Sequence, residues 1–258
     1  MHRTTAPIRF SLTWRSFHIS IATTSAERDL AFRIRHDVFL DELLQRPRAD
    51  GLERDDFDDQ CDHILVRHLT TGEAVGTARL NCSTQNDRFY SANEFSIAGL
   101  LALSETKVEV GRTCLRRSFR NNMALGALGR GISSYAAAAG ATWLFGCTSV
   151  MTADLTTTAS LCARFRIIGA HHHSFGAMPL PAYAMPGLES AIASLDPLTI
   201  ERTDLNELLP PLLRVYLKAG AAVSAAPALD RDFGCVDFFT MLDLRRHNSS
   251  FLGRFAPC

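Results

Sequence analysis

The amino-acid sequence predicts an α/β protein of the α+β type, in which helices flank a central, mixed and mostly antiparallel sheet. Two observations indicate this class. Segments with the two-residue apolar period of strands alternate with segments of helical period, and an early pair of strands joined by a short turn makes an antiparallel hairpin. With 258 residues the chain can bury a substantial core. We expect one domain over residues 1–258, with residues 1–15 as a disordered N-terminal segment.

The first elements are a strand and a long helix. Apolar and polar residues alternate over residues 17–21, which is typical of a half-buried strand. Ser25 is placed to cap a helix over residues 26–44, in which apolar side chains recur at helical spacing. An acid-rich run at residues 53–62 follows, and we interpret it as a structured loop.

The clearest hairpin comes next. Its strands are predicted over residues 63–69 and 74–82, and the turn between them offers Gly72 for a positive φ. A third strand is predicted over residues 107–115. Later elements are helices over residues 123–139, 155–168 and about 212–222, and strands over residues 142–147 and 236–242. Asn121 or Asn122 and Asp154 are the expected helix caps, and residues 170–186 show no pattern.

Composition excludes several classes of protein. Acidic and basic side chains balance at 27 each, so no global field favours nucleic acid as a partner. The seven cysteines form no CxxC pair, which favours reduced thiols in a cytoplasmic protein over a disulfide framework or a zinc site. No apolar run approaches the roughly 18 to 20 residues of a membrane helix, so any contact with the inner membrane is expected to be peripheral. The three consecutive histidines at 171–173 cannot readily converge on one ion, and we expect no metal.

The densest candidate for chemistry is the acidic run that ends at His63. A solvated loop is the usual meaning of such a run. Phe57 interrupts it and a strand follows at once, so some carboxylates are expected to be held against the sheet edge. Fixed carboxylates can attract a cationic substrate or accept a proton from an attacking amine. Calcium is a third option, but the ligand pattern of a calcium loop is absent.

Charged side chains also fall inside predicted strands. Alternation places Glu109 and Arg112 on opposite faces of one strand, and Arg79 lies in the strand before it. Buried ions are costly unless paired, so these residues belong either to a functional site or to a structural network. Arg116, Arg117 and Arg120 follow the strand directly, and they form either an anion site before a helix or a solvated turn.

Five motifs follow one another along the chain: Arg35-x-x-Val38-Phe39-x-x-Glu42-Leu43; Asp50-Gly51-Leu52-Glu53-x-Asp55-x-Phe57-Asp58-x-x-Cys61-Asp62-His63; Thr71-Gly72-x-x-Val75-Gly76-Thr77-x-Arg79-Leu80; Phe89-Tyr90-Ser91-x-x-Glu94-Phe95; and Glu109-x-Gly111-Arg112. Together they resemble the ornithine lipid N-acyltransferases, relatives of the acyl-homoserine-lactone synthases in the GNAT superfamily. The match runs from about Phe32 to Phe145 and resumes over residues 209–239.

The resemblance implies a GNAT-like fold whose strands at 107–115 and 142–147 splay to admit a thioester arm. It implies no permanently bound cofactor and a donor that is the 4'-phosphopantetheine thioester of acyl-carrier protein, with a small-molecule amino acid as acceptor and lyso-ornithine lipid as product. The loop with which coenzyme A users hold a pyrophosphate is replaced by residues 120–124, which fits a carrier-protein donor. The tryptophan-bearing stretch of the homoserine-lactone synthases is absent at residues 45–49.

These considerations assign expected roles. Glu109 is the candidate base for the attacking amine, and Arg112 holds Glu109 or the acidic loop in place. Arg35 or Arg79 is expected to bind the acceptor carboxylate. The acidic loop is expected to orient the amine and any cationic side chain through Glu53, Asp55 and Asp58. Glu94 is a further candidate for binding the cation. The carrier is expected to dock on Arg116, Arg117 and Arg120. The alternatives are a synthase of another N-acyl amino acid or of an acyl-homoserine lactone, and an inactive module that binds acyl-carrier protein or lipid.

Overall fold

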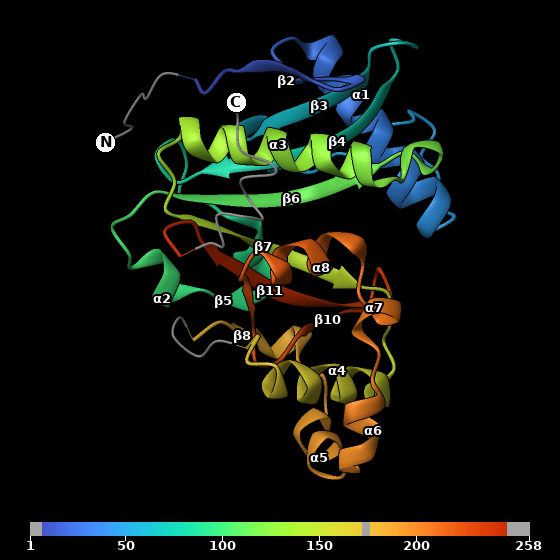
Figure 1. The fold of residues 1–258 in the computed structure, drawn as a ribbon, viewed down its shortest axis with the longest axis vertical. Coiled ribbons are helices and arrows are strands. Elements are labelled where there is room, and N and C mark those ends of the chain that lie inside the picture. The colour runs from blue at the N-terminus through green and yellow to red at the C-terminus, as the bar shows by residue number, and fades with distance from the viewer. Residues whose placement is uncertain (1–6, 172–175, 247–258) are drawn as a thin grey trace. The chain divides into compact units, whose positions relative to one another are not determined.

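The computed structural model describes residues 7–171 and 176–246. The chain divides into two compact units, which are described separately (Figure 1). Within the described residues, the first comprises 7–89 and 106–144, and the second comprises 90–105, 145–171 and 176–246. The expectation of a single domain stays a prediction.

The first unit is built on an antiparallel sheet in which β1, β2, β3, β4 and β6 are neighbours in that order. Its strands are β1 (Ser11–Trp14), β2 (Phe17–Ile21), β3 (Asp62–His68), β4 (Ala74–Cys82) and β6 (Lys107–Leu115). The predicted hairpin is confirmed, and Gly72 in its turn has a φ of 70°. The expectation of disorder up to residue 15 is wrong for β1, because its backbone pairs with β2.

Helices cover both faces of this sheet (Figure 1). Helix α3 (Asn122–Ala138) packs on the face of Ile19 and Ile64, where a Cβ at Gly131 would come within 2.8 Å of Ile19. Helix α1 (Ser25–Arg35) packs with Leu65 on the opposite face. Because neighbouring residues of a strand point to opposite faces, the two helices enclose the sheet between them.

The predicted helix over residues 26–44 differs from the structure in two details. Its cap is Thr24 rather than Ser25, because the side chains of Thr24 and Glu27 form a reciprocal capping box. After Arg35 the α-helix continues as a π-helix, η1 (His36–Leu43), whose wider turn the apolar spacing did not indicate.

The second unit contains the neighbouring strands β7 (Trp143–Val150, which begins in the first unit), β11 (Cys235–Asp243) and β10 (Ala228–Asp230), with β9 (Ala222–Val223) paired to β11. A small separate sheet pairs β5 (Phe95–Ser96) with β8 (Met178–Pro179). The helices are α2 (Ala98–Leu101), α4 (Leu155–Ile167), α5 (Leu188–Ala193), α6 (Pro197–Arg202), α7 (Leu205–Leu208) and α8 (Pro211–Lys218). Its core includes Phe165 and Phe238, whose rings meet edge to face at 5.1 Å between centroids.

Short 3-10 turns complete the two units: η2 (Asp58–Gln60) and η4 (Arg117–Phe119) in the first, and η3 (Tyr90–Asn93) and η5 (Pro181–Tyr183) in the second. The predicted fold class, helices flanking a mostly antiparallel sheet, is confirmed. Among the described residues, no helix combines the length and apolar character needed to cross a bilayer.

Candidate active site

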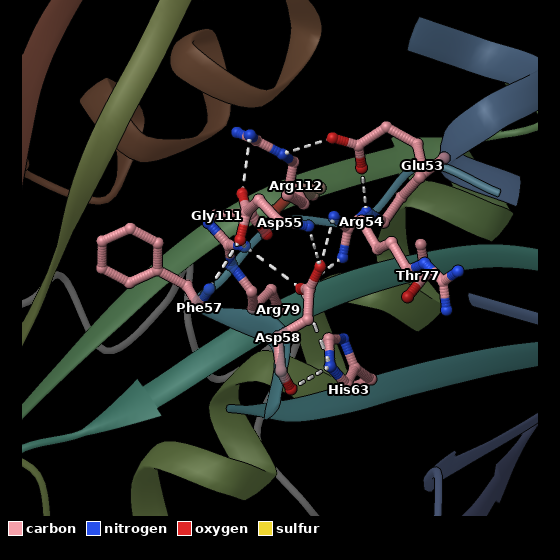
Figure 2. A network of polar contacts seen from close by, with 12 residues as sticks. Glu53, Arg54, Asp55, Phe57, Asp58, His63, Thr77, Arg79, Gly111 and Arg112 are labelled. Carbon is pink, nitrogen blue, oxygen red and sulfur yellow. Dashed lines mark hydrogen bonds and ion pairs between the residues drawn. The ribbon is translucent and has the colours of Figure 1, made fainter. Parts of the chain in front are cut away.

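A buried network of arginines and carboxylates occupies the α1 face of the first unit (Figure 2). Arg35 comes from the last turn of α1, and Arg79 and Arg112 come from β4 and β6. The carboxylates are Glu53, Asp55 and Asp58, all from the acidic loop before β3. The loop is therefore fixed to the sheet at these three residues, which agrees with the interpretation of a structured loop rather than with the solvated alternative.

Asp58 lies at the centre of the network. Its two oxygens accept hydrogen bonds from Nη1 and Nη2 of Arg35 at 2.6 and 2.9 Å, and Oδ1 also accepts one from Nη1 of Arg79 at 3.1 Å. The backbone N–H of Asp55 donates a further bond at 2.8 Å. Burial alone raises the pKa of Asp58, but the hydrogen bonds and charges of Arg35 and then the charge of Arg79 outweigh it and lower this pKa to about 2.

Arg112 joins the network through a β-bulge. The register between β4 and β6 shifts, because Thr77 is opposite Cys114 whereas Arg79 is opposite Gly111, and Arg112 adopts a φ of 48°. Simple alternation placed Arg112 on the face away from Glu109, and that prediction is wrong.

The bulge redirects the guanidinium of Arg112 toward the loop. Nε reaches Glu53 Oε1 at 3.2 Å, and Nη2 reaches Asp55 Oδ2 at 3.0 Å. Arg79 contacts the other oxygen of Asp55 at 2.5 Å, so Arg112 and Arg79 lie on the same side of the sheet (Figure 2). The expectation that Arg112 holds the acidic loop in place agrees with this geometry.

The network balances three carboxylates against three guanidinium groups, and its members differ in exposure. The side chain of Arg35 is 0% exposed, and each of its three nitrogens donates to Glu53 or Asp58. Arg35 is therefore committed to the acidic loop. The expectation that Arg35 or Arg79 binds the acceptor carboxylate stays a prediction. The accessible edge consists of Asp55 and Arg112, with side chains 26% and 18% exposed; Arg79, at 4%, is committed to Asp55 and Asp58.

Glu109 is buried on the same face of the sheet. It lies opposite Asn81 on β4, two residues from Gly111, which lies opposite Arg79. Alternation along β6 therefore directs its side chain to the side of Arg79.

Burial chiefly, with a contribution from the negative charge of Glu109, raises the pKa of Cys61 to about 12, so this thiol is neutral near pH 7.

His63 is a member of the site to which sequence reasoning gave no role. Its ring lies edge to face against Phe32, and Nε2 is 3.2 Å from the carbonyl oxygen of Asp58. Burial lowers the pKa of His63 to about 4, so the ring is neutral near pH 7. The only signal in the sequence was its position at the end of the acidic run.

The arginines expected to dock a carrier follow β6 in the chain, and they differ in whether they form ion pairs within the protein. Arg116 contacts Asp37 at 2.5 Å, and Arg120 forms a bidentate pair with Glu42 at 2.6 and 2.7 Å. Arg117 is exposed at the start of η4. The cluster is therefore partly tied to the protein itself, and Arg117 is the member most accessible to a partner.

Glu94, the last residue with an expected role, belongs to the second unit. It follows η3, is 2% exposed, and forms part of a separate acidic cluster. The structure thus brings together Glu53, Asp55, Asp58, Arg35, Arg79 and Arg112 in one network, with Glu109 on the same face, and leaves Glu94 and the three docking arginines outside it.

Comparison with known proteins places this site in a protein class. The model of the acetyltransferase (GNAT) domain matches residues 34–130, which include every member of the network. The AHL synthase LasI superposes with a TM-score of 0.51 at 13% identity, over 92% of this chain and 94% of that one. FeeM, an N-acyl amino acid synthase from uncultured soil microbes, gives a TM-score of 0.50 at 12% identity, over 93% and 98%. The chain is an acyltransferase with the GNAT fold.

Relatives with higher sequence identity identify the family to which the chain belongs. An L-ornithine N(alpha)-acyltransferase from Agrobacterium fabrum is 30% identical over 251 residues, which cover 91% of this chain and 82% of the relative. One from Rhizobium meliloti is 29% identical over 249 residues, with coverage of 91% and 82%. The chain belongs to the L-ornithine N(alpha)-acyltransferase family, as the resemblance in sequence motifs implied.

Proposed function

We propose that this acyltransferase moves a fatty acyl group, such as a 3-hydroxy fatty acyl group, from acyl-carrier protein to the α-amino group of L-ornithine and so makes lyso-ornithine lipid. The observation that carries the proposal is the 30% identity to an L-ornithine N(alpha)-acyltransferase along 91% of the chain. The product is amphipathic, so we also propose a cytoplasmic protein that contacts the inner membrane peripherally.

The chemistry is direct attack of an amine on a thioester. Glu109, directly or through a water, takes a proton from the α-ammonium group of the acceptor. The neutral amine attacks the acyl carbonyl carbon, the C–N bond forms, the C–S bond breaks, and the thiol of the 4'-phosphopantetheine arm leaves with a proton. Backbone N–H groups stabilise the oxyanion. Cys61 is no nucleophile in this scheme, because burial keeps its thiol neutral.

The network supports this chemistry by fixing the acidic loop. Arg35, Glu53 and Asp58 are positioning residues in the proposal, because their charged groups are buried and paired with one another. Asp55 and Arg112 form the accessible edge and are the network's contacts for the acceptor amino acid. Arg112 has a planar guanidinium that suits a carboxylate, and Asp55 suits an ammonium group.

Carrier docking gives a first prediction. Arg117→Glu should raise the KM for acyl-carrier protein by about tenfold at low salt, because it reverses one charge of the basic cluster proposed to dock the carrier. The difference should shrink as salt screens the charges. Arg117 is preferred to Arg116 and Arg120, since reversing those would place like charges beside Asp37 and Glu42. Arg202→Glu, an exposed arginine of α6, is the matched control. Equal KM values for the two variants would mean that the carrier docks elsewhere.

Acceptor choice gives a second prediction. A site that pairs the side-chain ammonium of ornithine with a carboxylate should discriminate strongly, by about 10⁴-fold in kcat/KM, against norvaline, which lacks that group. Lysine is one methylene longer and should lose only about 1–3 kcal/mol. Competition among ornithine, lysine, norvaline and glycine for one acyl-carrier donor measures both values. Equal use of norvaline and ornithine would leave only a broader N-acyl amino acid synthase.

Lipid extracts test the proposed function in cells. Expression of the protein in a host without aminolipids of this type should produce a new ninhydrin-positive lipid whose mass fits N-acylornithine. The same host carrying an empty vector is the control. A new lipid with the mass of another N-acyl amino acid or of an acyl-homoserine lactone would replace ornithine in the proposal, and the absence of any new lipid would favour an inactive binding module.

A further inference from the structure

Arg88 lies at the border of the candidate active site, and the proposed chemistry gives it no role. It belongs to the loop between β4 and η3, and its side chain is exposed. Its guanidinium carbon lies over the ring of Phe57, 4.3 Å from the ring centre, and that of Arg79 lies 5.5 Å from the same centre. Both distances are within the range of a cation–π contact.

Phe57 connects Arg88 to the network of arginines and carboxylates. The ring is 5% exposed, and the backbone N–H of Phe57 donates to Asp55 Oδ1 at 2.9 Å (Figure 2). Asp55 is also a member of the accessible edge of the network. The guanidinium of Arg88 is therefore held beside the acidic loop at the end that a substrate can reach.

The backbone of Arg88 is fixed to the strands that carry the proposed base. Asn81 Nδ2 on β4 donates to the carbonyl oxygen of Arg88 at 2.7 Å, and the N–H of Arg88 donates to Asn86 Oδ1 at 3.2 Å. Asn81 is buried and lies directly opposite Glu109 on β6. Side chains opposite each other in an antiparallel pair have Cβ atoms about 4.5–5.5 Å apart. Arg88 is thus attached both to the acidic loop and to the strand position that faces Glu109.

The charge of Arg88 is available to a ligand, in contrast to the charges of the network. Each guanidinium of the network contacts two carboxylates of the protein, which holds for Arg35, Arg79 and Arg112. Arg112 can add a contact, but a net positive charge for an incoming carboxylate has to come from outside this balanced set. Arg88 forms no ion pair with any of the residues that the structure describes.

We propose that Arg88 binds the α-carboxylate of the acceptor amino acid and thereby makes the enzyme prefer an α-amino acid to an amine without a carboxylate. The inference rests on the proposed function in placing the α-amine of the acceptor at Glu109. The amine and the carboxylate share one carbon atom, so a carboxylate held by Arg88 brings the amine toward the base. A guanidinium over an aromatic ring keeps in-plane N–H groups for a planar carboxylate.

Calorimetry on the full-length protein tests the proposal with L-ornithine and L-ornithinamide as titrants. Unacylated acyl-carrier protein with its 4'-phosphopantetheine arm is present, so the donor site is filled and no reaction occurs. Ornithinamide keeps both amino groups and replaces the carboxylate with a neutral amide. The wild type should bind ornithine at least about tenfold more tightly, because the amide loses a charged, bidentate contact. Equal affinities for the two compounds would overturn the proposal.

Variants assign the preference to Arg88. Arg88→Gln should weaken binding of ornithine at least about tenfold and leave binding of ornithinamide nearly unchanged. Arg88→Lys keeps the charge and should recover part of the preference. Arg33→Gln, the same change at an exposed arginine of α1, should alter neither affinity. A full preference for ornithine in Arg88→Gln would overturn the proposal.

Steady-state kinetics distinguish the carboxylate of the acceptor from the phosphate of the donor arm, the other anion that reaches the site in the proposed reaction. Arg88→Gln should raise the KM for ornithine at least about tenfold and leave the KM for acyl-carrier protein unchanged. A raised KM for the carrier with an unchanged KM for ornithine would show that Arg88 serves the donor, and would overturn the proposal.

The two proposals fail in distinguishable ways. If ornithine binds with a preference that depends on Arg88 but the wild type acylates no amino acid, the carboxylate site stands and the proposed function fails. If acylornithine forms and Arg88→Gln keeps the wild-type KM for ornithine, the proposed function stands and the carboxylate site fails.

Discussion

Glu109→Gln is expected to lower turnover by about a hundredfold or more, the usual scale for loss of a general base. Glutamine has nearly the shape of glutamate but cannot accept the proton of the attacking ammonium group. Because glutamine keeps the size of the buried Glu109 side chain and its ability to form hydrogen bonds, the neutral amide should leave the fold nearly intact. The measurement is kcat with a saturating acyl-carrier donor and ornithine, together with the melting temperature of each protein.

Two outcomes would contradict this role. A kcat unchanged by Glu109→Gln would remove the residue from the mechanism. A large fall in melting temperature, with activity lost in proportion to folded protein, would mean that Glu109 is a structural ion. Glu73→Gln is the matched control, because Glu73 is an exposed carboxylate in the turn of the same sheet and should change neither quantity.

Asp58→Asn is expected to lower the free energy of unfolding by about 3–5 kcal/mol near pH 7, the range for breaking a buried ion pair from one side. Asp58 accepts hydrogen bonds from both Arg35 and Arg79, and removing its charge leaves those guanidinium groups partly uncompensated where water cannot reach them. Denaturant unfolding measures the change. Asp59→Asn, at the exposed neighbouring residue, should stay within about 0.5 kcal/mol of wild type.

The pH dependence of stability provides an independent check on the same residue. The pKa of Asp58 is about 2 in the folded protein and 3.8 as its ordinary value. A carboxyl group whose pKa is lowered by folding stabilises the folded state at pH values above its unfolded pKa. Asp58 should therefore add about 2 kcal/mol to the free energy of unfolding above pH 4, and this contribution should be lost as the pH falls from 4 to 2. Asp58→Asn should lack this component. Equal acid sensitivity of Asp58→Asn and Asp59→Asn would show that the network contributes nothing measurable to stability.

Much of the fold followed from local signals in the sequence. Strands β2, β4 and β6 begin and end where apolar alternation and turn residues placed them, and α3 begins beside its asparagine cap. Strand β1 is short and partly exposed, so it has no apolar pattern, and its pairing with β2 depends on a partner rather than on its own residues. The π-helix after Arg35 was missed because the apolar residues on either side of it continue at helical spacing.

The sequence indicated which charged residues belong to the site, but not which of them form ion pairs with one another. The motifs identified the charged residues of the network, but which arginine contacts which carboxylate is set by contacts between residues 18 to 59 positions apart. Alternation failed at Arg112 because the bulge interrupts the two-residue period of the strand. Gly111, a glycine inside a strand pattern, was the signal in the sequence that could have indicated it. The burial of Arg35 depends on how α1 packs on the sheet, so the sequence left it as a candidate for binding substrate.

Reconstitution with purified components tests the central claim most directly. The purified protein is incubated with a 3-hydroxyacyl thioester of acyl-carrier protein and L-ornithine, and products are followed by mass spectrometry with fragmentation while free carrier thiol is counted. The account predicts Nα-acylornithine in an amount equal to the carrier thiol released. An intact thioester in the presence of ornithine, or an acyl group found on the side-chain amine instead of the α-amine, would contradict it.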